Sequence, residues 1–252
     1  MELLGAPARL NVNYWNTLPS LHPNALQRLI GMVRSPRATL AGAVTEPRSL
    51  DVAAWILAIS IVCSAGFLMT PVGRLAALDQ QVRQLESFGA VITDTSYDEL
   101  KRVVPYRPAI SAGVIAVGWP VLWLVCARFL QWLGNRAGRG QATFAQVLTV
   151  VVHASAIFAL RELVAAPINY ARESLGGATS LSMLMPAFGE TTFPARLLGA
   201  VDIFVVWWLV LVAVGMSVLY RTRTLPIARW LFGAYAGGAA VLALTQALRG
   251  GI

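Results

Sequence analysis

One apolar stretch constrains this chain more than any other, because it is long enough to cross a bilayer and yet carries charge. Residues 144–168, FAQVLTVVVHASAIFALRELVAAPI, include His153, Arg161 and Glu162. About 20 apolar residues span the hydrocarbon core, and an ionised side chain near its centre costs at least about 2.5 kcal/mol on insertion scales. The stretch therefore predicts a membrane helix whose polar side chains are covered by neighbouring helices.

The composition assigns the whole chain to the membrane. Of its 252 residues, 57% are hydrophobic and only 13% are charged, and the mean hydropathy is +0.63. These values exclude an ordinary soluble domain of this size. The formal net charge of +8 does not indicate nucleic-acid binding, because no loop concentrates arginine with aromatic residues. Retention of loops on an anionic cytoplasmic leaflet explains the charge better.

The hydropathy pattern predicts an all-α, polytopic membrane bundle with five transmembrane helices and short amphipathic helices outside them. The expected spans are residues 52–69, 109–133, 144–168, 197–220 and 227–248. Residues 1–50 are expected to form a cytoplasmic N-terminal segment, and residues 51–252 the membrane domain. The short loops after the second and fourth spans contain arginine and no acid, which predicts a cytoplasmic N-terminus and an external C-terminus.

A basic amphipathic helix is expected in the N-terminal segment. Apolar residues recur at positions 26, 29, 30 and 33, the spacing of one helix face, and Arg28, Arg34 and Arg37 accompany them. Such a helix suits the cytoplasmic membrane surface. The alternative, in which the apolar stripe packs beneath the spans, fits the pattern equally well.

The long loop after the first span, residues 70–108, is expected to be external. Leu75, Leu78, Val82 and Leu85 recur there at heptad-like spacing. This pattern predicts a helix that either covers the bundle, which we favour, or meets a partner protein.

Arg161 and Asp202 are predicted to form an ion pair within the membrane. In the expected orientation the third span runs outward and the fourth inward, so at about 1.5 Å per residue both side chains reach a similar depth. Neither charge is tolerated in hydrocarbon without a partner, and Glu162 can share the pair. His153, eight residues before Arg161, is expected to face the same interior.

This predicted cluster of His153, Arg161, Glu162 and Asp202 has two interpretations. It is either a polar clasp that fixes the third span against the fourth, or part of a path for protons or substrate. The clasp is favoured, because a proton path needs more than one titratable group in series at mid-membrane.

The fifth span contains small residues at the spacing of a close helix contact. Gly233 with Gly237, and Ala234 with Gly238, lie four positions apart on shared faces. Such pairs let a second backbone approach. Packing within one bundle is favoured over packing between two copies.

No catalytic, metal-binding or cofactor-binding motif is recognisable. The two histidines are separated by the first two spans, no HExxH or CxxC occurs, and GGATS and GRGQ lack the lysine of a phosphate-binding loop. Ser155 lies on nearly the opposite side of a helix from His153, so the two cannot act as nucleophile and base. Cys63 and Cys126 fall within spans and are expected to be apolar fillers. We expect a protein that is not an enzyme and needs no cofactor.

Three segments resemble the Yip domain family, five-span proteins named for their interaction with Ypt/Rab GTPases. They are RLIGMVRSPRATL before the first span, GQATFAQVLTVVVHAS at the start of the third, and LLGAVDIFVVWWLVLVAVGMSVLYRT in the fourth. The resemblance extends from about Gln27 to Gln246. Eukaryotic members act in Golgi and endoplasmic-reticulum vesicle traffic through prenylated Rab proteins, whereas some prokaryotic members accompany ABC-type export permeases.

The resemblance implies a non-enzymatic scaffold or accessory subunit of another membrane machine, such as an ABC-type exporter. The alternative is a small transporter or channel that uses His153, Arg161 and Asp202. A short arginine-rich segment replaces the long N-terminal tail of eukaryotic relatives, which argues against a Rab partner. The expected partners are the lipid bilayer and another membrane protein. The alanine- and arginine-rich, lysine-poor composition favours a GC-rich bacterium and hence its plasma membrane.

Overall fold

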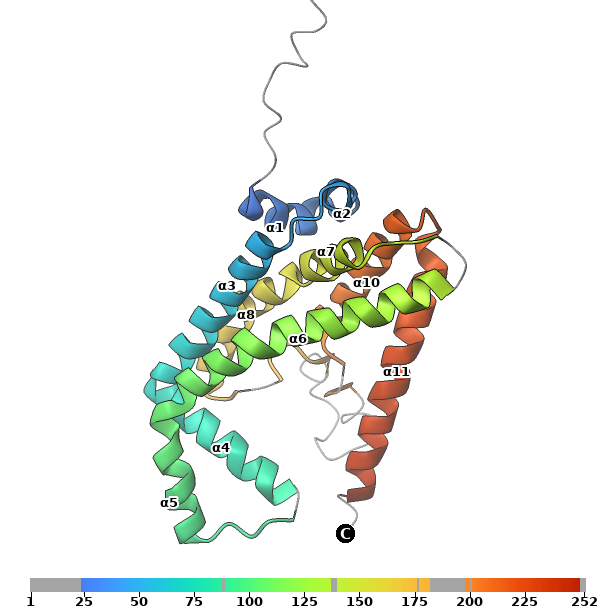
Figure 1. The fold of residues 1–252 in the computed structure, drawn as a ribbon. Coiled ribbons are helices and arrows are strands. Elements are labelled where there is room, and N and C mark those ends of the chain that lie inside the picture. Colours follow the sequence, from blue (N-terminus) through green and yellow to red (C-terminus); the bar gives the residue numbers. More distant parts are fainter. Residues whose placement is uncertain are drawn as a thin grey trace, which may run out of the picture.

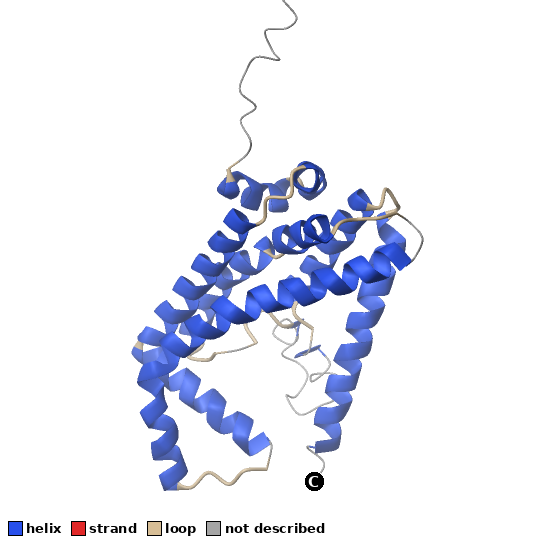
Figure 2. Ribbon diagram, viewed as in Figure 1, coloured by secondary structure: helices blue, strands red, loops and turns tan. Residues whose placement is uncertain are grey.

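The computed structural model describes residues 24–87, 89–136, 140–175, 177–181, 198–199 and 201–249, and this part of the chain is built from helices (Figures 1 and 2). The elements are, in order, α1 (Ala25–Arg34), α2 (Pro36–Thr45), α3 (Leu50–Met69), α4 (Pro71–Ser87), α5 (Asp94–Val103), the 3₁₀ turn η2 (Val104–Tyr106), α6 (Arg107–Arg136), α7 (Phe144–Ala154), α8 (Ala156–Ala171), α10 (Ile203–Leu219) and α11 (Thr224–Arg249). The all-α prediction is confirmed for the described residues.

Three described helical segments have the length and composition needed to cross a membrane. They are Leu50–Met69, Asp94–Arg136 and Phe144–Ala171, and the apolar helix Ile203–Leu219 is shorter. The three segments coincide with the first three predicted spans. The chain therefore contains several candidate membrane helices.

The long helices run in alternating directions between two ends of the bundle (Figure 1). Helices α1 and α2 lie at one end, together with the first residues of α3, α7 and α11. Helices α4 and α5 lie at the other end, where α11 finishes. In the middle, α7 packs on α6 and α10, and α8 packs on α3.

The third predicted span is not one regular helix. It begins as expected, with Thr143 accepting the Gln146 backbone N–H in a capping box. At Ser155, however, the regular pattern is interrupted, which divides the segment into α7 and α8. The two helices still form one continuous apolar segment of 28 residues.

The fourth predicted span, residues 197–220, is longer than the helix that forms. Helix α10 has 17 residues and starts at Ile203, so Asp202 is its N-cap and does not lie inside it. Aspartate is a preferred N-cap because its side chain accepts the free N–H groups of the first turn. The prediction of a helical Asp202 is therefore wrong, for a reason that the residue type itself supplies.

The N-terminal helices pack into the bundle and are also partly exposed. Met32 of α1 and Leu40 of α2 are fully buried in the apolar core, and α2 packs on α7 and α10. Leu26, Ile30 and Val33 remain exposed on α1. The interpretation that the helix packs on the bundle is therefore confirmed for its buried face, whereas contact of the exposed face with the membrane surface stays a prediction.

The loop at 70–108 contains helices that extend beyond the ends of α3 and α6 (Figure 1). Helix α4 packs mainly on the end of α3, and α5 has no buried residue. At the corner between α3 and α4, a Cβ on Gly73 would lie 2.0 Å from the Phe67 carbonyl oxygen, so this close approach requires glycine. These helices cover the end of α3 rather than the bundle as a whole.

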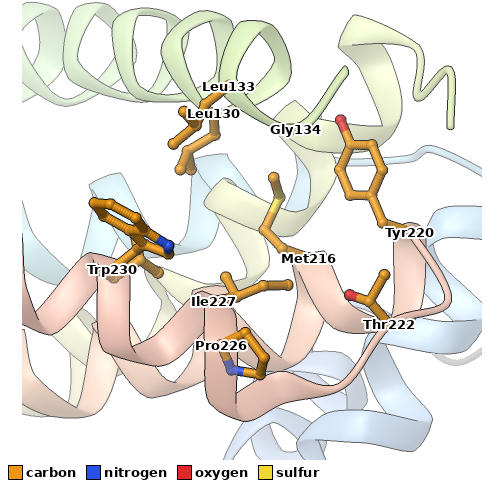
Figure 3. Close-up of a pocket in the computed structure, with 10 residues that line it drawn as sticks. Leu130, Leu133, Gly134, Met216, Tyr220, Thr222, Pro226, Ile227 and Trp230 are labelled. Atoms are coloured by element: carbon orange, nitrogen blue, oxygen red, sulfur yellow. The ribbon is translucent and has the colours of Figure 1, made fainter. Parts of the chain in front are cut away.

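A pocket of about 350 Å³ lies between α6, α10 and α11 (Figure 3). Leu130 and Leu133 of α6 face Ile227 and Trp230 of α11 across it, and Met216 of α10 also lines it. The remaining lining residues are Gly134, Tyr220, Thr222, Pro226 and Leu231. The pocket is therefore mainly apolar, and its two hydroxyl groups, on Tyr220 and Thr222, lie near the loop between α10 and α11.

Candidate functional site: a polar cluster around Asp202

Asp202 is held in place by its own backbone and by the helix that it caps. It forms an antiparallel bridge with Ser180, with hydrogen bonds from Leu181 N to Val201 O (2.9 Å) and from Ile203 N to Thr179 O (3.1 Å). Its Oδ1 accepts the backbone N–H of Phe204 at 2.8 Å. A carboxylate at this position also interacts favourably with the positive end of the α10 dipole.

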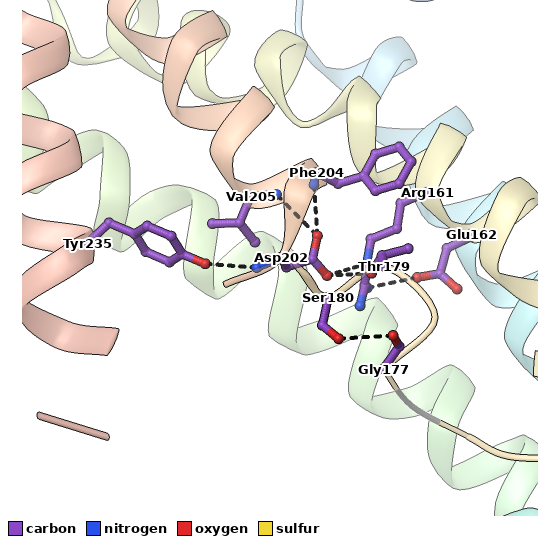
Figure 4. Close-up of polar contacts among 9 residues, drawn as sticks. All are labelled: Arg161, Glu162, Gly177, Thr179, Ser180, Asp202, Phe204, Val205 and Tyr235. Atoms are coloured by element: carbon purple, nitrogen blue, oxygen red, sulfur yellow. Dashed lines mark hydrogen bonds and ion pairs between the residues drawn. The ribbon is translucent and has the colours of Figure 1, made fainter. Parts of the chain in front are cut away.

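The second carboxylate oxygen of Asp202 joins α8 to α10 (Figure 4). Arg161 Nε donates to Asp202 Oδ2 at 3.1 Å, and the Thr179 hydroxyl donates to the same oxygen at 2.6 Å. Arg161 Nη1 also lies 3.3 Å from Glu162 Oε1. The predicted Arg161–Asp202 ion pair is thus present, and Glu162 shares the arginine.

Helix α11 also reaches this cluster. The backbone N–H of Asp202 donates to the Tyr235 hydroxyl oxygen at 3.1 Å (Figure 4). Neither Tyr235 nor Thr179 was predicted from the sequence to belong to this cluster. Thr179 lies in GGATS, a segment without periodicity, and only the presence of a tyrosine among small residues in the fifth span could have indicated Tyr235.

His153 does not join this cluster. Its ring is completely buried, and Nδ1 lies 2.8 Å from the Thr149 carbonyl oxygen one turn earlier in α7. The predicted cluster of four is therefore wrong in including His153, because a bond within α7 orients the ring and a helix interruption separates it from Arg161.

A second polar centre lies at the interruption between α7 and α8. The indole N–H groups of Trp123 and Trp208 both donate to Ser155 Oγ, at 3.0 and 3.2 Å, and the Ser155 hydroxyl donates to the Val151 carbonyl at 2.8 Å. Buried tryptophans usually find such an acceptor. This role of Ser155 as a shared acceptor was not predicted from the sequence, where the residue was weighed only as a nucleophile.

The sequence as a whole matches one known protein family. The Yip1 domain matches residues 30–247, most of the sequence. The chain belongs to the Yip1 domain family. Neither a search of individually curated proteins nor one of solved structures found a match. The described polar cluster and the apolar helices are thus features of a Yip1-family membrane protein.

The basic helix of this Yip1-family protein uses its arginines in two ways. Arg28 forms an ion pair with Asp51 and donates to the Arg48 carbonyl at 2.8 Å, so its side chain is only 11% exposed. Arg34 and Arg37 are exposed. The prediction of a surface arginine is wrong for Arg28, because its side chain lies against α3 and pairs with Asp51 in the first turn of that helix.

The small residues of α11 do not pack against the described part of the Yip1 domain. A Cβ added to Gly233, Gly237 or Gly238 would meet nothing within 4 Å, and Ala234 is exposed. Close packing occurs instead at Gly215 of α10, where a Cβ would lie 2.4 Å from Val150 Cγ1. The favoured prediction of packing within the bundle is therefore wrong for the described residues, none of which covers these glycines.

The charged side chains of this site are paired with one another. Each charged side chain of the Asp202 cluster has an opposite charge within 3.3 Å. Among the described residues, no group of three histidine, cysteine, aspartate or glutamate side chains is placed to hold a metal ion. The cluster connects α8, the 177–181 segment, α10 and α11 at one end of the bundle.

Proposed function

We propose that this Yip1-family protein is a non-enzymatic scaffold or accessory subunit of another membrane protein in a bacterial plasma membrane. The family resemblance suggests an ABC-type exporter as the partner. The observation that carries the proposal is the contrast between the paired charges of Arg161, Glu162 and Asp202 and the exposed apolar faces of the described helices.

The proposed topology has five spans, with the N-terminus cytoplasmic and the C-terminus external. The alternating direction of the helices supports it, since α11 ends on the opposite side from α1 (Figure 1). Arginines follow α10 in the loop that contains Arg221 and Arg223, at the same end as α1. A green fluorescent protein fused to the C-terminus should not fluoresce when exported unfolded, whereas alkaline phosphatase there should be active. The opposite pattern would contradict the topology.

A scaffold needs a surface that another membrane protein can contact closely. Helix α11 offers one, because Gly233, Gly237 and Gly238 are exposed among the described residues and a Cβ at any of them would meet nothing within 4 Å. In a bilayer, where apolar surface alone gives little drive for helix association, small residues allow the close contacts that hold helices together. The external helices α4 and α5 offer a second surface.

A transport role would require charged groups that are free to bind a proton or a substrate. The side chains of Arg161, Glu162 and Asp202 are 35%, 27% and 20% exposed, but they bind one another, and His153 is completely buried among the core residues of α7. This arrangement supports the scaffold in preference to the transporter.

The proposal is tested by quantitative purification from the native membrane in mild detergent. We compare the wild type with Gly237→Leu, which blocks the α11 face, and with Gly118→Leu on α6 as a matched control, since a Cβ meets nothing within 4 Å at either glycine. A membrane protein that accompanies the wild type and Gly118→Leu but is lost from Gly237→Leu supports the proposal. A pure protein with no companion would contradict it.

A further inference from the structure

The pocket between α6, α10 and α11 is not part of the Asp202 cluster and lies at the opposite end of the bundle. Its volume of about 350 Å³ falls in the range of small-molecule sites, and its walls are mainly leucine, isoleucine, methionine and tryptophan (Figure 3). Empty apolar space of this size would leave its lining atoms without dispersion contacts. In a membrane the chemistry that fits such walls is an acyl chain.

One polar atom in the pocket lacks a partner. The Thr222 hydroxyl oxygen is buried and has no hydrogen-bond partner in the described structure, although Thr222 lines the pocket. Buried hydroxyls are usually satisfied, so an unpaired one beside a pocket points to a ligand group that accepts or donates there. The neighbouring Tyr220 hydroxyl is already used, since it donates to Asn135 at 2.8 Å.

The charge around the pocket has a single sign. The sequence contains no aspartate or glutamate in residues 107–161 or 203–252, which include all three helices that form the pocket. Arg221 and Arg223 flank Thr222 in the chain, and both are exposed. A headgroup beside Thr222 would therefore meet positive charge without a competing acid.

We propose that this pocket binds one anionic phospholipid, with an acyl chain between α6 and α11 and its phosphate near Thr222, Arg221 and Arg223. The acyl chain accounts for the apolar walls. The phosphate oxygens accept from the unpaired Thr222 hydroxyl and balance the two arginines. This site is independent of the scaffold role, because it does not use the α11 glycine face.

The site is tested by native mass spectrometry of the detergent-purified protein, with dioleoyl phosphatidylglycerol or dioleoyl phosphatidylcholine added at equal concentration. The wild type should retain one phosphatidylglycerol in clear preference to phosphatidylcholine. Combined Arg221→Asn and Arg223→Gln substitutions should reduce that preference by about tenfold, as two surface arginines attract an anionic lipid. Asparagine is chosen at 221 because the backbone there has φ +52°.

Two controls separate this site from general attraction of anionic lipid. Arg34→Gln with Arg37→Gln removes two exposed arginines from the same end of the bundle and should leave the preference unchanged. Leu133→Trp should fill the pocket and displace the lipid, whereas Leu122→Trp, at a similarly exposed α6 position outside the pocket, should not. Equal retention of both lipids by the wild type, or equal lipid loss in either matched pair, would overturn the proposal.

Discussion

The segment Phe144–Ala171 and the segment that ends with α6 are both apolar enough to cross a membrane, yet they occupy opposite environments. In the most apolar window of the first, 67% of the residues are buried inside the protein, whereas in Asp94–Arg136 only 6% are. The buried segment carries Ser155, Arg161 and Glu162, each bonded to a neighbouring element or residue. The exposed segment presents leucine, valine and aromatic side chains.

This difference shows how a membrane bundle can carry polar groups. Charged side chains lie on the segment that other helices surround, where they find partners and hold the helices in register. The peripheral segment keeps apolar surface for lipid or another protein. Substitutions in the two environments should therefore have unequal effects.

The largest effect is expected at Asp202, which is both ion-pair partner and helix cap. Asp202→Ala should lower the unfolding free energy by about 3 kcal/mol, because Arg161 loses its partner and α10 loses its cap. Asp202→Asn should lose less, since the amide oxygen can still accept the Phe204 N–H. Thermal unfolding in detergent, followed by tryptophan fluorescence, measures both. Equal losses for the two variants would show that the cap contributes nothing.

Alanine substitutions at two glycines, one in each environment, should change the unfolding free energy in opposite directions. Gly215→Ala should destabilise by about 1–3 kcal/mol, because the new Cβ would lie 2.4 Å from Val150, a stiff β-branched neighbour. Gly118→Ala on α6 meets nothing within 4 Å and should instead stabilise by about 0.5–1 kcal/mol through helix propensity. The same unfolding measurement applies. If both changes had the same sign, the contrast in packing would be wrong.

Ser155→Ala should have a smaller effect of about 1 kcal/mol. The change leaves the indole N–H groups of Trp123 and Trp208 without their acceptor. The effect is smaller than at Asp202 because a neutral hydrogen bond between membrane helices contributes less free energy than a charged one. Near-ultraviolet circular dichroism should change along with the unfolding temperature, since the two rings lose a common anchor. A spectrum identical to that of the wild type would count against the shared bond.

The smallest effect is expected at Gly237. Gly237→Leu should not lower the unfolding free energy of the purified protein and should raise it by less than about 1 kcal/mol through helix propensity, because its position on α11 is exposed. A clear loss of stability in detergent would show that the α11 face is covered by the protein's own chain.

Some of this structure could be predicted from composition and spacing, and some could not. Long apolar runs identified α3, α6 and the α7–α8 segment, and the rule that charges in hydrocarbon need partners identified Arg161 with Asp202. The contact with Thr179 could not be predicted, since the 177–181 segment has no periodicity. The orientation of His153 depends on a bond to a backbone carbonyl, which no side-chain pattern reveals.

The glycine pattern shows another limit of the sequence. Small residues four apart indicate that a backbone can approach, and they do so equally for a helix of the same chain, a second protein or lipid. Gly215, a single glycine in α10, is where the close contact occurs, and Leu40 of α2 is the unexpected neighbour. Only the arrangement of helices distinguishes the two kinds of glycine.

The central claim is that Arg161 and Asp202 form an energetic unit that fixes α8 to α10. A double-mutant cycle of Arg161→Leu and Asp202→Asn tests it directly, because asparagine keeps the cap while both charges are removed, and Glu162 is present in all four proteins. Unfolding free energies from detergent titration should show a coupling of at least about 1 kcal/mol, with the double variant losing less than the sum of the singles. Losses that simply add would contradict the claim.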